Sequence, residues 1–345
     1  MRARVVVVAP ATLVATLTLL LSAASAGGAL VSPNDPYFGS QWGLFNTGQT
    51  ILGTAGKPGV DAHLPEAWTV ARGSRSVKVA VIDTGIDYQL ADLAGNVDVA
   101  DGANFVDPGQ PPLDTQGHGT AMAGIIGAVG NNGIGVAGVD WQVSLIPEKV
   151  PLAVGGQAPS GLPGNDEPII AEAITDAVSK GARVVNLSLG GDLPATDIDR
   201  AMSAAPNTLF VTSAGNHGVS ETTRPNYPCV TAPGDLPPPN KLCVAAVDNT
   251  GALDFESSFS GSSVDLAAPG TNIAELQLPG TRGEFSNGHG YGYDSGTSQA
   301  TAFVSGVAAQ LLARDPSLDG AALRARILAT VDPLPGFAGQ VASGG

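Results

Sequence analysis

The chain has 345 residues, of which 43% are apolar, and its formal net charge is −15. This length suffices for one large α/β domain or for two smaller ones. The acidic balance argues against nucleic acid or an anionic membrane surface as a partner, because both are negatively charged. The acidic residues are spread along the chain and form no tail, as is typical of a soluble exported protein.

The first residues have the features of an export signal. Arg2 and Arg4 precede an apolar run over residues 5–21, and Ala-Ser-Ala at 24–26 fits a small-residue cleavage site. A membrane anchor is the alternative, but an apolar run of about 17 residues is marginal for a span. We therefore expect a signal peptide over residues 1–26, a single mature domain over residues 27–345, and a secreted, extracellular product without membrane contact.

Only two cysteines are present, Cys229 and Cys243. An oxidising compartment favours a disulfide between them, and closing a loop of this size would stabilise the fold by about 3 kcal/mol. Two free thiols, or part of a metal site, are the alternatives. No histidine stands nearby at ligand spacing, so the pattern disfavours zinc.

Apolar runs alternate with helical patterns along the chain. Residues 33–75 and 155–164 are rich in turn-forming types and predict loops. Buried strands are predicted over residues 77–82, 184–189, 209–213, 242–247 and 264–267. Helices are predicted over residues 119–128, 168–180, 298–313 and 319–330. The alternation predicts an α/β fold with a mostly parallel central sheet and helices on both faces, in three layers.

Polar residues stand just after two of the predicted strands. Asp83 opens an Asp-Thr-Gly sequence after the strand over 77–82, and Asn216 follows the strand over 209–213. Parallel sheets bind substrate beyond the carboxyl ends of their strands. Aspartic peptidases also carry Asp-Thr-Gly, but their mechanism needs two such carboxylates, and this chain has no second copy.

Two further segments supply a base and a nucleophile. Glycines flank His118 and let backbone and substrate approach closely. Ser298 opens a predicted helix, whose free N–H groups suit developing negative charge. Taken alone, His118 could be structural, Ser298 a helix cap and Asn216 a turn residue. Together with Asp83 they are the parts that a serine peptidase needs.

The chain order Asp83, His118, Ser298 is that of subtilisin. With Asn-Asp-Pro-Tyr-Phe at 34–38 and Val-Asn-Leu-Ser-Leu-Gly-Gly at 185–191, the chain resembles the subtilisin-like (subtilase) serine peptidases across about residues 33–345. The resemblance implies that Ser298 attacks the peptide carbonyl and that His118, oriented by Asp83, carries the proton. It implies an oxyanion site made by Asn216 and the Ser298 N–H group.

The resemblance also implies polypeptide substrates and a monomeric enzyme. Ser188, Leu189 and Gly190 would pair with an extended substrate as an added strand. Specificity pockets would be lined partly by these residues and by Ala214, Gly215 and Asn216. No cluster of carboxylates marks a pocket for dibasic sites, so we expect broad specificity.

Family members often bind structural calcium, and residues 131–136 resemble the calcium loop. Oxygen ligands, including backbone carbonyls, suit Ca²⁺. By similarity the ligands would be Asp35, Asp92, Asn132 and the carbonyls of Gly130, Ile134 and Val136. An Asn-Gly turn without a metal is the alternative.

The chain departs from the family pattern in three places. Most subtilases carry a propeptide between the signal peptide and the catalytic domain, whereas in this chain only a few residues separate Ala26 from the 34–38 segment. We therefore expect either a separately supplied folding assistant or inhibitor, or unaided folding. The chain stops at Gly345, short of the usual final segment. After Ser298 stand Gln-Ala-Thr-Ala instead of Met-Ala-Ser-Pro, and Ala302 in place of proline suggests some ligase or transpeptidase character.

Two other classes of function remain as alternatives. A catalytically silent subtilase fold would bind peptides without cleaving them, but all four expected catalytic positions hold competent residue types. A lipase or esterase uses the same acyl chemistry, but no Gly-x-Ser-x-Gly elbow surrounds Ser298. The preferred interpretation is a secreted serine endopeptidase.

Overall fold

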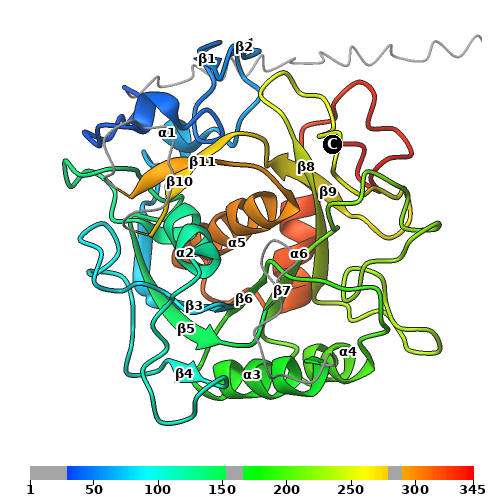
Figure 1. Ribbon diagram of the computed structural model, residues 1–345. Helices are drawn as coiled ribbons and strands as arrows, with labels where there is room; N and C mark the ends of the chain where they lie inside the picture. Colours follow the sequence, from blue (N-terminus) through cyan, green and yellow to red (C-terminus); the bar gives the residue numbers. More distant parts are fainter. Residues whose placement is uncertain (1–28, 153–165, 279–289) are drawn as a thin grey trace, which may run out of the picture.

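The computed structural model describes residues 29–152, 166–278 and 290–345. Within these ranges, seven strands form one parallel sheet in the order β4-β5-β3-β6-β7-β8-β9 (Figure 1). The strands are β3 (Gly73–Asp83), β4 (Ala103–Asn104), β5 (Gln142–Lys149), β6 (Val184–Leu187), β7 (Leu209–Ser213), β8 (Lys241–Val247) and β9 (Leu266–Pro269). Every position of β6, β7 and β8 is buried, as expected for central strands of a sheet covered on both faces.

Helices cover both faces of this sheet (Figure 1). One face carries α2 (His118–Gly127), α5 (Thr297–Arg314) and α6 (Gly320–Leu328), and the other carries α3 (Glu167–Ser179) and α4 (Thr196–Ser203). Strand β3 shows the division, because Val79 and Val81 pack in the core with α2 and α5, whereas Ala80 and Ile82 pack with α3 and α4. Alternate residues of a strand point to opposite faces. The predicted three-layer α/β fold class is confirmed.

A hairpin and the N-terminal segment lie over the side of the molecule that holds α2 and α5. The hairpin pairs β10 (Ile273–Leu276) with β11 (Tyr291–Asp294) in antiparallel register. The N-terminal segment contains η1 (Phe38–Ser40), β1 (Thr50–Ile51), β2 (Thr54–Ala55) and α1 (Leu64–Ala67). The hairpin contacts the first turn of α5 through a hydrogen bond from Gln299 to Glu275.

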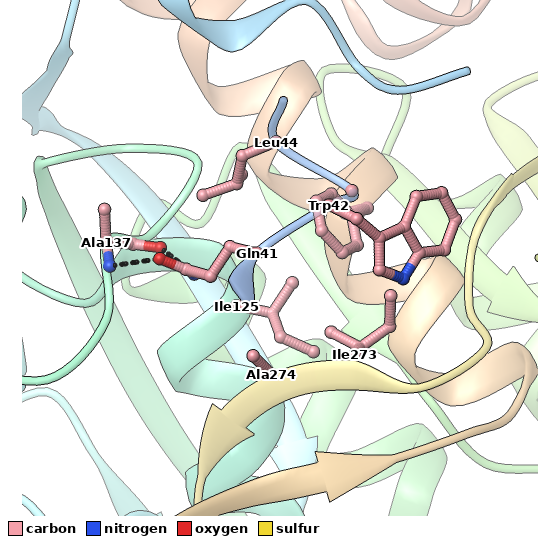
Figure 2. A pocket seen from close by; sticks show the side chains of 9 residues that line it. Gln41, Trp42, Leu44, Ile125, Ala137, Ile273 and Ala274 are labelled. Atoms are coloured by element: carbon pink, nitrogen blue, oxygen red, sulfur yellow. Dashed lines mark hydrogen bonds between the residues drawn. The ribbon is translucent and has the colours of Figure 1, made fainter. Parts of the chain in front are cut away.

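Figure 2 shows where the N-terminal segment meets the hairpin and α2. The buried side chain of Gln41 donates to the carbonyl of Ala137 at 2.7 Å and accepts from its N–H group at 2.9 Å. Ile125 of α2 and the β10 residues Ile273 and Ala274 line the same small cavity. The two hydrogen bonds tie the loop after α2 to the N-terminal segment, and the apolar contacts hold the hairpin in place.

The predicted strands and helices are all present, with ends that differ by a few residues. The sequence did not predict β5, because Pro147 and the charged residues after it interrupt the apolar run and argue against a central strand. The prediction of loops throughout residues 33–75 was wrong in detail, since four elements of two to four residues fall there. The predicted signal peptide and the loop over 155–164 lie outside the described residues.

Candidate active site

The fold brings Asp83 and His118 together at the carboxyl end of the sheet. Asp83 is the last residue of β3 and His118 is the first residue of α2. The Nδ1 atom of His118 lies 2.8 Å from Oδ1 and 2.9 Å from Oδ2 of Asp83, whose side chain is fully buried. Both distances are within hydrogen-bond range, so the carboxylate fixes the orientation of the ring.

Backbone contacts hold this pair in place. The Thr84 N–H group donates to Asp83 Oδ1 at 2.7 Å, and the hydroxyl of Thr84 accepts from the Gly119 N–H group at 2.9 Å. A Cβ on Gly119 would lie 2.1 Å from the Gly85 carbonyl oxygen. Only glycine therefore lets α2 begin this close to the end of β3.

The electrostatic environment of His118 favours its protonated form. Burial lowers the pKa of the imidazole, but the charge and the hydrogen bond of Asp83, followed by the charges of Glu275 and Asp114, raise it to about 9. Asp114 itself accepts hydrogen bonds from the N–H group and the hydroxyl of Thr120, at 3.0 and 2.6 Å. The ring can therefore hold a proton that it takes from a nucleophile.

Ser298 lies in the first turn of α5. Its hydroxyl donates to the Ser188 carbonyl at 3.3 Å, and the Ser188 hydroxyl donates to the Ser298 carbonyl at 2.9 Å. Ser298 and His118 both line a cleft of about 870 Å³. Among the described residues, the Ser298 hydroxyl is hydrogen-bonded to Ser188 and not to His118. Hydrogen bonds between catalytic groups often tighten only when substrate binds.

Asn216 presents its amide to the cleft from the loop after β7. Its Oδ1 atom accepts from both the N–H group and the hydroxyl of Thr297, each at 2.9 Å. These two bonds occupy the oxygen, so the Nδ2 group is left to act as the donor. A Cβ on Gly296 would lie 3.1 Å from Asn216 Nδ2, which places this amide next to the turn that carries Ser298.

The predicted substrate-binding residues lie at the ends of two adjacent strands. Ser188, Leu189 and Gly190 follow β6 and line the cleft, and Gly215 follows β7 and lines it too. Ala214 is fully buried and belongs to the apolar cluster around the disulfide. The structure therefore brings together both predicted walls of the cleft.

Asn226 is a cleft residue that sequence reasoning did not identify. Its Nδ2 atom donates to the Ser213 carbonyl at 2.9 Å, and its N–H group donates to Glu221 at 2.6 Å. A Cβ on Gly190 would lie 2.4 Å from Asn226 Nδ2, and one on Gly215 would lie 2.9 Å from its Cγ. The Asn226 side chain therefore fills the space between the two walls.

Carboxylates also gather around the cleft, although the sequence showed no such cluster. Glu167 accepts from the Asp197 N–H group at 2.6 Å, and Asp192 pairs with Arg224 at 2.9 Å. The carboxylates that line the cleft are Asp166, Glu167, Asp192 and Asp294. Asp294 accepts from the Ser295 N–H group at 2.8 Å, so three of the four already have partners within the protein.

The three side-chain members of the predicted calcium set, Asp35, Asp92 and Asn132, come together. Asp35 accepts from the Asn131 and Asn132 N–H groups at 2.7 and 3.3 Å, and Asp92 accepts from the Asn132 amide and the Val136 N–H group at 2.8 and 3.0 Å. Burial, with a smaller contribution from the charge of Asp35, raises the pKa of Asp92 to about 6 against the opposing effect of its hydrogen bonds. Two buried carboxylates thus lie close together, and the described residues give neither of them a lysine or arginine within ion-pair distance.

No group of three or more His, Cys, Asp or Glu side chains suited to a metal ion occurs in the described part of the chain. The predicted calcium set holds only two carboxylates, and its other ligands are amide and carbonyl oxygens, which also suit Ca²⁺. The residues present therefore fit a hard cation.

Cys229 and Cys243 form a disulfide. The bond joins the segment after Tyr227 and Pro228, which line the cleft, to strand β8. Of the alternatives that the sequence left open, the disulfide is confirmed.

The model of the subtilase family of peptidases matches residues 74–343. The chain belongs to the subtilase family. Thermitase of Thermoactinomyces vulgaris is 36% identical over 310 residues, which cover 88% of this chain and 93% of thermitase. This subtilase is therefore a subtilisin-like serine endopeptidase.

Solved structures agree with the fold of this subtilase. A protease of Pseudoalteromonas arctica matches with a TM-score of 0.67 and 26% identity, over 90% of this chain and 96% of that chain. The serine protease of Aeromonas sobria, solved in complex with a chaperone, matches with a TM-score of 0.71 and 25% identity, over 88% of this chain and 58% of that chain. None of the described helices of this subtilase is long and apolar enough to cross a membrane.

Proposed function

We propose that this subtilase cleaves internal peptide bonds through a triad of Ser298, His118 and Asp83, with an acyl-enzyme intermediate. The observation that carries the proposal is the paired contact of His118 Nδ1 with both oxygens of the buried Asp83, at 2.8 and 2.9 Å. With Nδ1 engaged by Asp83, the other ring nitrogen of His118 is the one that can serve as the base, and His118 and Ser298 line the same cleft. A base held in one orientation beside a hydroxyl is the arrangement that nucleophilic acyl transfer requires.

Each group has a defined step. His118 takes the proton of the Ser298 hydroxyl as its oxygen attacks the carbonyl carbon of the substrate, and Asp83 stabilises the imidazolium that forms. The Asn216 amide and the Ser298 N–H group bind the oxyanion of the tetrahedral intermediate. His118 then gives its proton to the leaving amine, and water repeats the sequence on the acyl-enzyme.

The substrate is an extended polypeptide of varied sequence. Ser188, Leu189 and Gly190 leave strand β6 at the edge of the cleft, where a substrate strand can pair with their backbone. Gly215 lies on the opposite wall, and the Asn226 side chain fills the space between Gly190 and Gly215. Ala214, which the sequence predicted as a cleft residue, is fully buried and does not line the cleft. We propose broad specificity for the side chains of the substrate. Within that range, the four carboxylates that line the cleft would favour substrates with basic residues.

A matched pair of proteins tests this function. The wild type should cut a denatured protein substrate at many internal sites identified by mass spectrometry, and Ser298→Ala should cut none while keeping the same melting temperature. Equal cleavage by both proteins would refute the role of Ser298. Binding of peptide substrates without cleavage by the wild type would favour a silent fold.

Ligase or transpeptidase character is kept as the alternative to hydrolysis. It depends on the backbone N–H group that Ala302 has and proline lacks, within helix α5 and four residues after Ser298. The ratio of aminolysis to hydrolysis of a peptide ester, compared between the wild type and Ala302→Pro, tests it, and equal ratios would refute it.

Calcium is proposed as a structural ion bound by Asp35, Asp92 and Asn132 with the carbonyls of Gly130, Ile134 and Val136. The support is the pair of buried carboxylates, whose mutual repulsion a divalent cation would relieve. When bound, Ca²⁺ supplies stability and takes no part in the chemistry of Ser298.

Residues 1–26 are proposed as a signal peptide, with residues 27–345 as the secreted peptidase domain, acting as a monomer. The disulfide supports an oxidising compartment. A separate folding assistant is proposed as a partner because the similar Aeromonas sobria protease was solved with a chaperone. Refolding yield with and without a candidate assistant would test this partner.

A further inference from the structure

A buried acid and amide pair lies directly behind the proposed nucleophile. Gln299 follows Ser298 in α5, and its Nε2 atom donates to Oε2 of Glu275 in β10 at 3.1 Å. Only 2% of Gln299 and 3% of Glu275 is exposed, yet Gln299 still lines the cleft. In the sequence, Gln299 stood out only as a departure from the family pattern, and nothing pointed to Glu275.

The hairpin fixes the direction of the Glu275 side chain. Leu276 points to α2, where a Cβ on Gly124 would lie 2.7 Å from the Leu276 Cδ1 atom, and Ala274 lines the cavity of Figure 2. Because side chains alternate along a strand, Glu275 points the other way, toward the start of α5. Its pairing with Gly292 of β11 keeps this register.

The other end of the Gln299 amide lies against the turn that carries Ser298. A Cβ on Gly296 would lie 3.1 Å from Gln299 Oε1 and also 3.1 Å from Asn216 Nδ2. The amides of Gln299 and Asn216 therefore flank the same glycine. The Gln299 Nε2 group can only donate, so its bond to Glu275 determines that the oxygen end faces this turn.

We propose that Glu275 is a positioning residue for the proposed peptidase reaction. Glu275 acts on Ser298 through its hydrogen bond with Gln299, and on His118 through its negative charge. The inference rests on the proposed function for its kinetic part. It goes further because it adds a fourth ionisable group, from a different element, to the three residues of the triad.

The charged groups around both side chains define the electrostatic effect. His118 is faced by Asp83, Glu275 and Asp114, and Glu275 is faced by Asp294, Gln299 and His118. Burial, and after it the charge of Asp294, raise the pKa of Glu275, while the Gln299 hydrogen bond and the charge of His118 lower it, with a net rise to about 8. Glu275 therefore changes charge in the pH range where His118 must become a neutral base.

The sign of the effect follows from these charges. Ionised Glu275 stabilises the imidazolium, so its removal should lower the pKa of His118. Loss of the Gln299 amide should act in the same direction, because its hydrogen bond favours the ionised form of Glu275. Glu275→Gln keeps an acceptor for Gln299 and removes only the ionisable group, and Gln299→Met keeps the size of the side chain and removes the amide.

The decisive measurement is an NMR titration of the His118 ring, which needs no turnover. The chain has four histidines, so ¹⁵N-labelled imidazole signals can be assigned with His118→Ala. Both variants should titrate His118 at a pH lower than wild type by about half a unit or more. Glu172→Gln, an exposed acid on α3, is the matched control and should leave the titration unmoved.

Kinetics supply the second readout. Gln299→Met should lower kcat for a peptide substrate by about three- to tenfold with KM unchanged, and Glu275→Gln should add little in the Gln299→Met background because the two residues act as one unit. His118 titrations equal to wild type in both variants would overturn the inference, even if Glu275→Gln failed to fold and only Gln299→Met were measured. Shifted titrations with no peptidase activity in the wild type would refute the proposed function and leave the coupling intact.

Discussion

Replacing Asp83 by asparagine should remove most of the catalytic rate while leaving the fold intact. The side chain is fully buried, and both of its oxygens face His118 Nδ1, at 2.8 and 2.9 Å. Asparagine has nearly the same shape, but one of its two ends is an N–H donor. That end would favour the wrong tautomer of the ring, with the proton on the nitrogen that must accept from Ser298.

The size of this effect can be bounded. Loss of the carboxylate from a Ser-His-Asp triad lowers kcat by about 10⁴-fold, which corresponds to about 5 kcal/mol of activation free energy. The assay is kcat on a chromogenic peptide at constant temperature, with the melting temperature recorded for each protein. Asp87→Asn, in the loop that follows β3, is the matched control and should keep kcat within about twofold.

The effect of pH separates this mechanism from simple loss of folding. Negative charge from Asp83 raises the pKa of His118, although burial opposes it, so Asp83→Asn should let the ring become neutral at a lower pH. Residual activity in the variant should therefore begin to rise at a lower pH than in the wild type. A kcat within tenfold of wild type, with an unmoved pH profile, would refute the reasoning.

Four further outcomes are expected. Asn216→Ala should lower kcat by about 10²- to 10³-fold with little change in KM, measured on the same peptide; a loss confined to KM would contradict an oxyanion role. Gly119→Ala should lower the free energy of unfolding by about 1–3 kcal/mol in urea titrations, because its Cβ would meet the Gly85 carbonyl at 2.1 Å; unchanged stability would show that α2 can move. Cys229→Ser should cost about 3 kcal/mol in the same titrations, since it breaks the only disulfide of a two-cysteine chain, and an unaffected midpoint would count against that estimate. Chelation of calcium should lower the melting temperature of the wild type but not of Asp92→Asn, and equal losses in both would place any calcium elsewhere.

Local patterns in the sequence predicted the central sheet well. Buried parallel strands such as β6 and β7 are mostly apolar and β-branched runs, and this pattern is visible in a single sequence. Strand β5 was not predicted, because Pro147, Glu148 and Lys149 break its apolar run. Its burial comes from pairing with β3 over most of its length, which no local pattern encodes.

Some residues of the candidate site could be predicted from the sequence, and others could not. Asp83, His118, Ser298 and Asn216 could be found because each stands in a short, distinctive segment at the end of a strand or the start of a helix. Asn226 could not, since it reaches Gly190 and Gly215 only after the chain has turned back over the cleft. Side chains that support a site through tertiary contact leave little local signal.

The hairpin residues illustrate the same limit. Glu275 lies in an apolar strand and pairs with a side chain 24 positions away, so its importance depends on a contact that only three-dimensional packing creates. Burial of an acid in β10 breaks the usual preference for exposed carboxylates. Such an exception becomes visible when the structure shows which groups surround it.

The most direct test of the catalytic centre is peptide mapping after reaction with a fluorophosphonate. An activated serine should react at Ser298 and at no other serine of the chain, and His118→Ala should abolish the adduct although Ser298 is still present. Labelling that persists in His118→Ala, or an adduct on a different residue, would contradict the account.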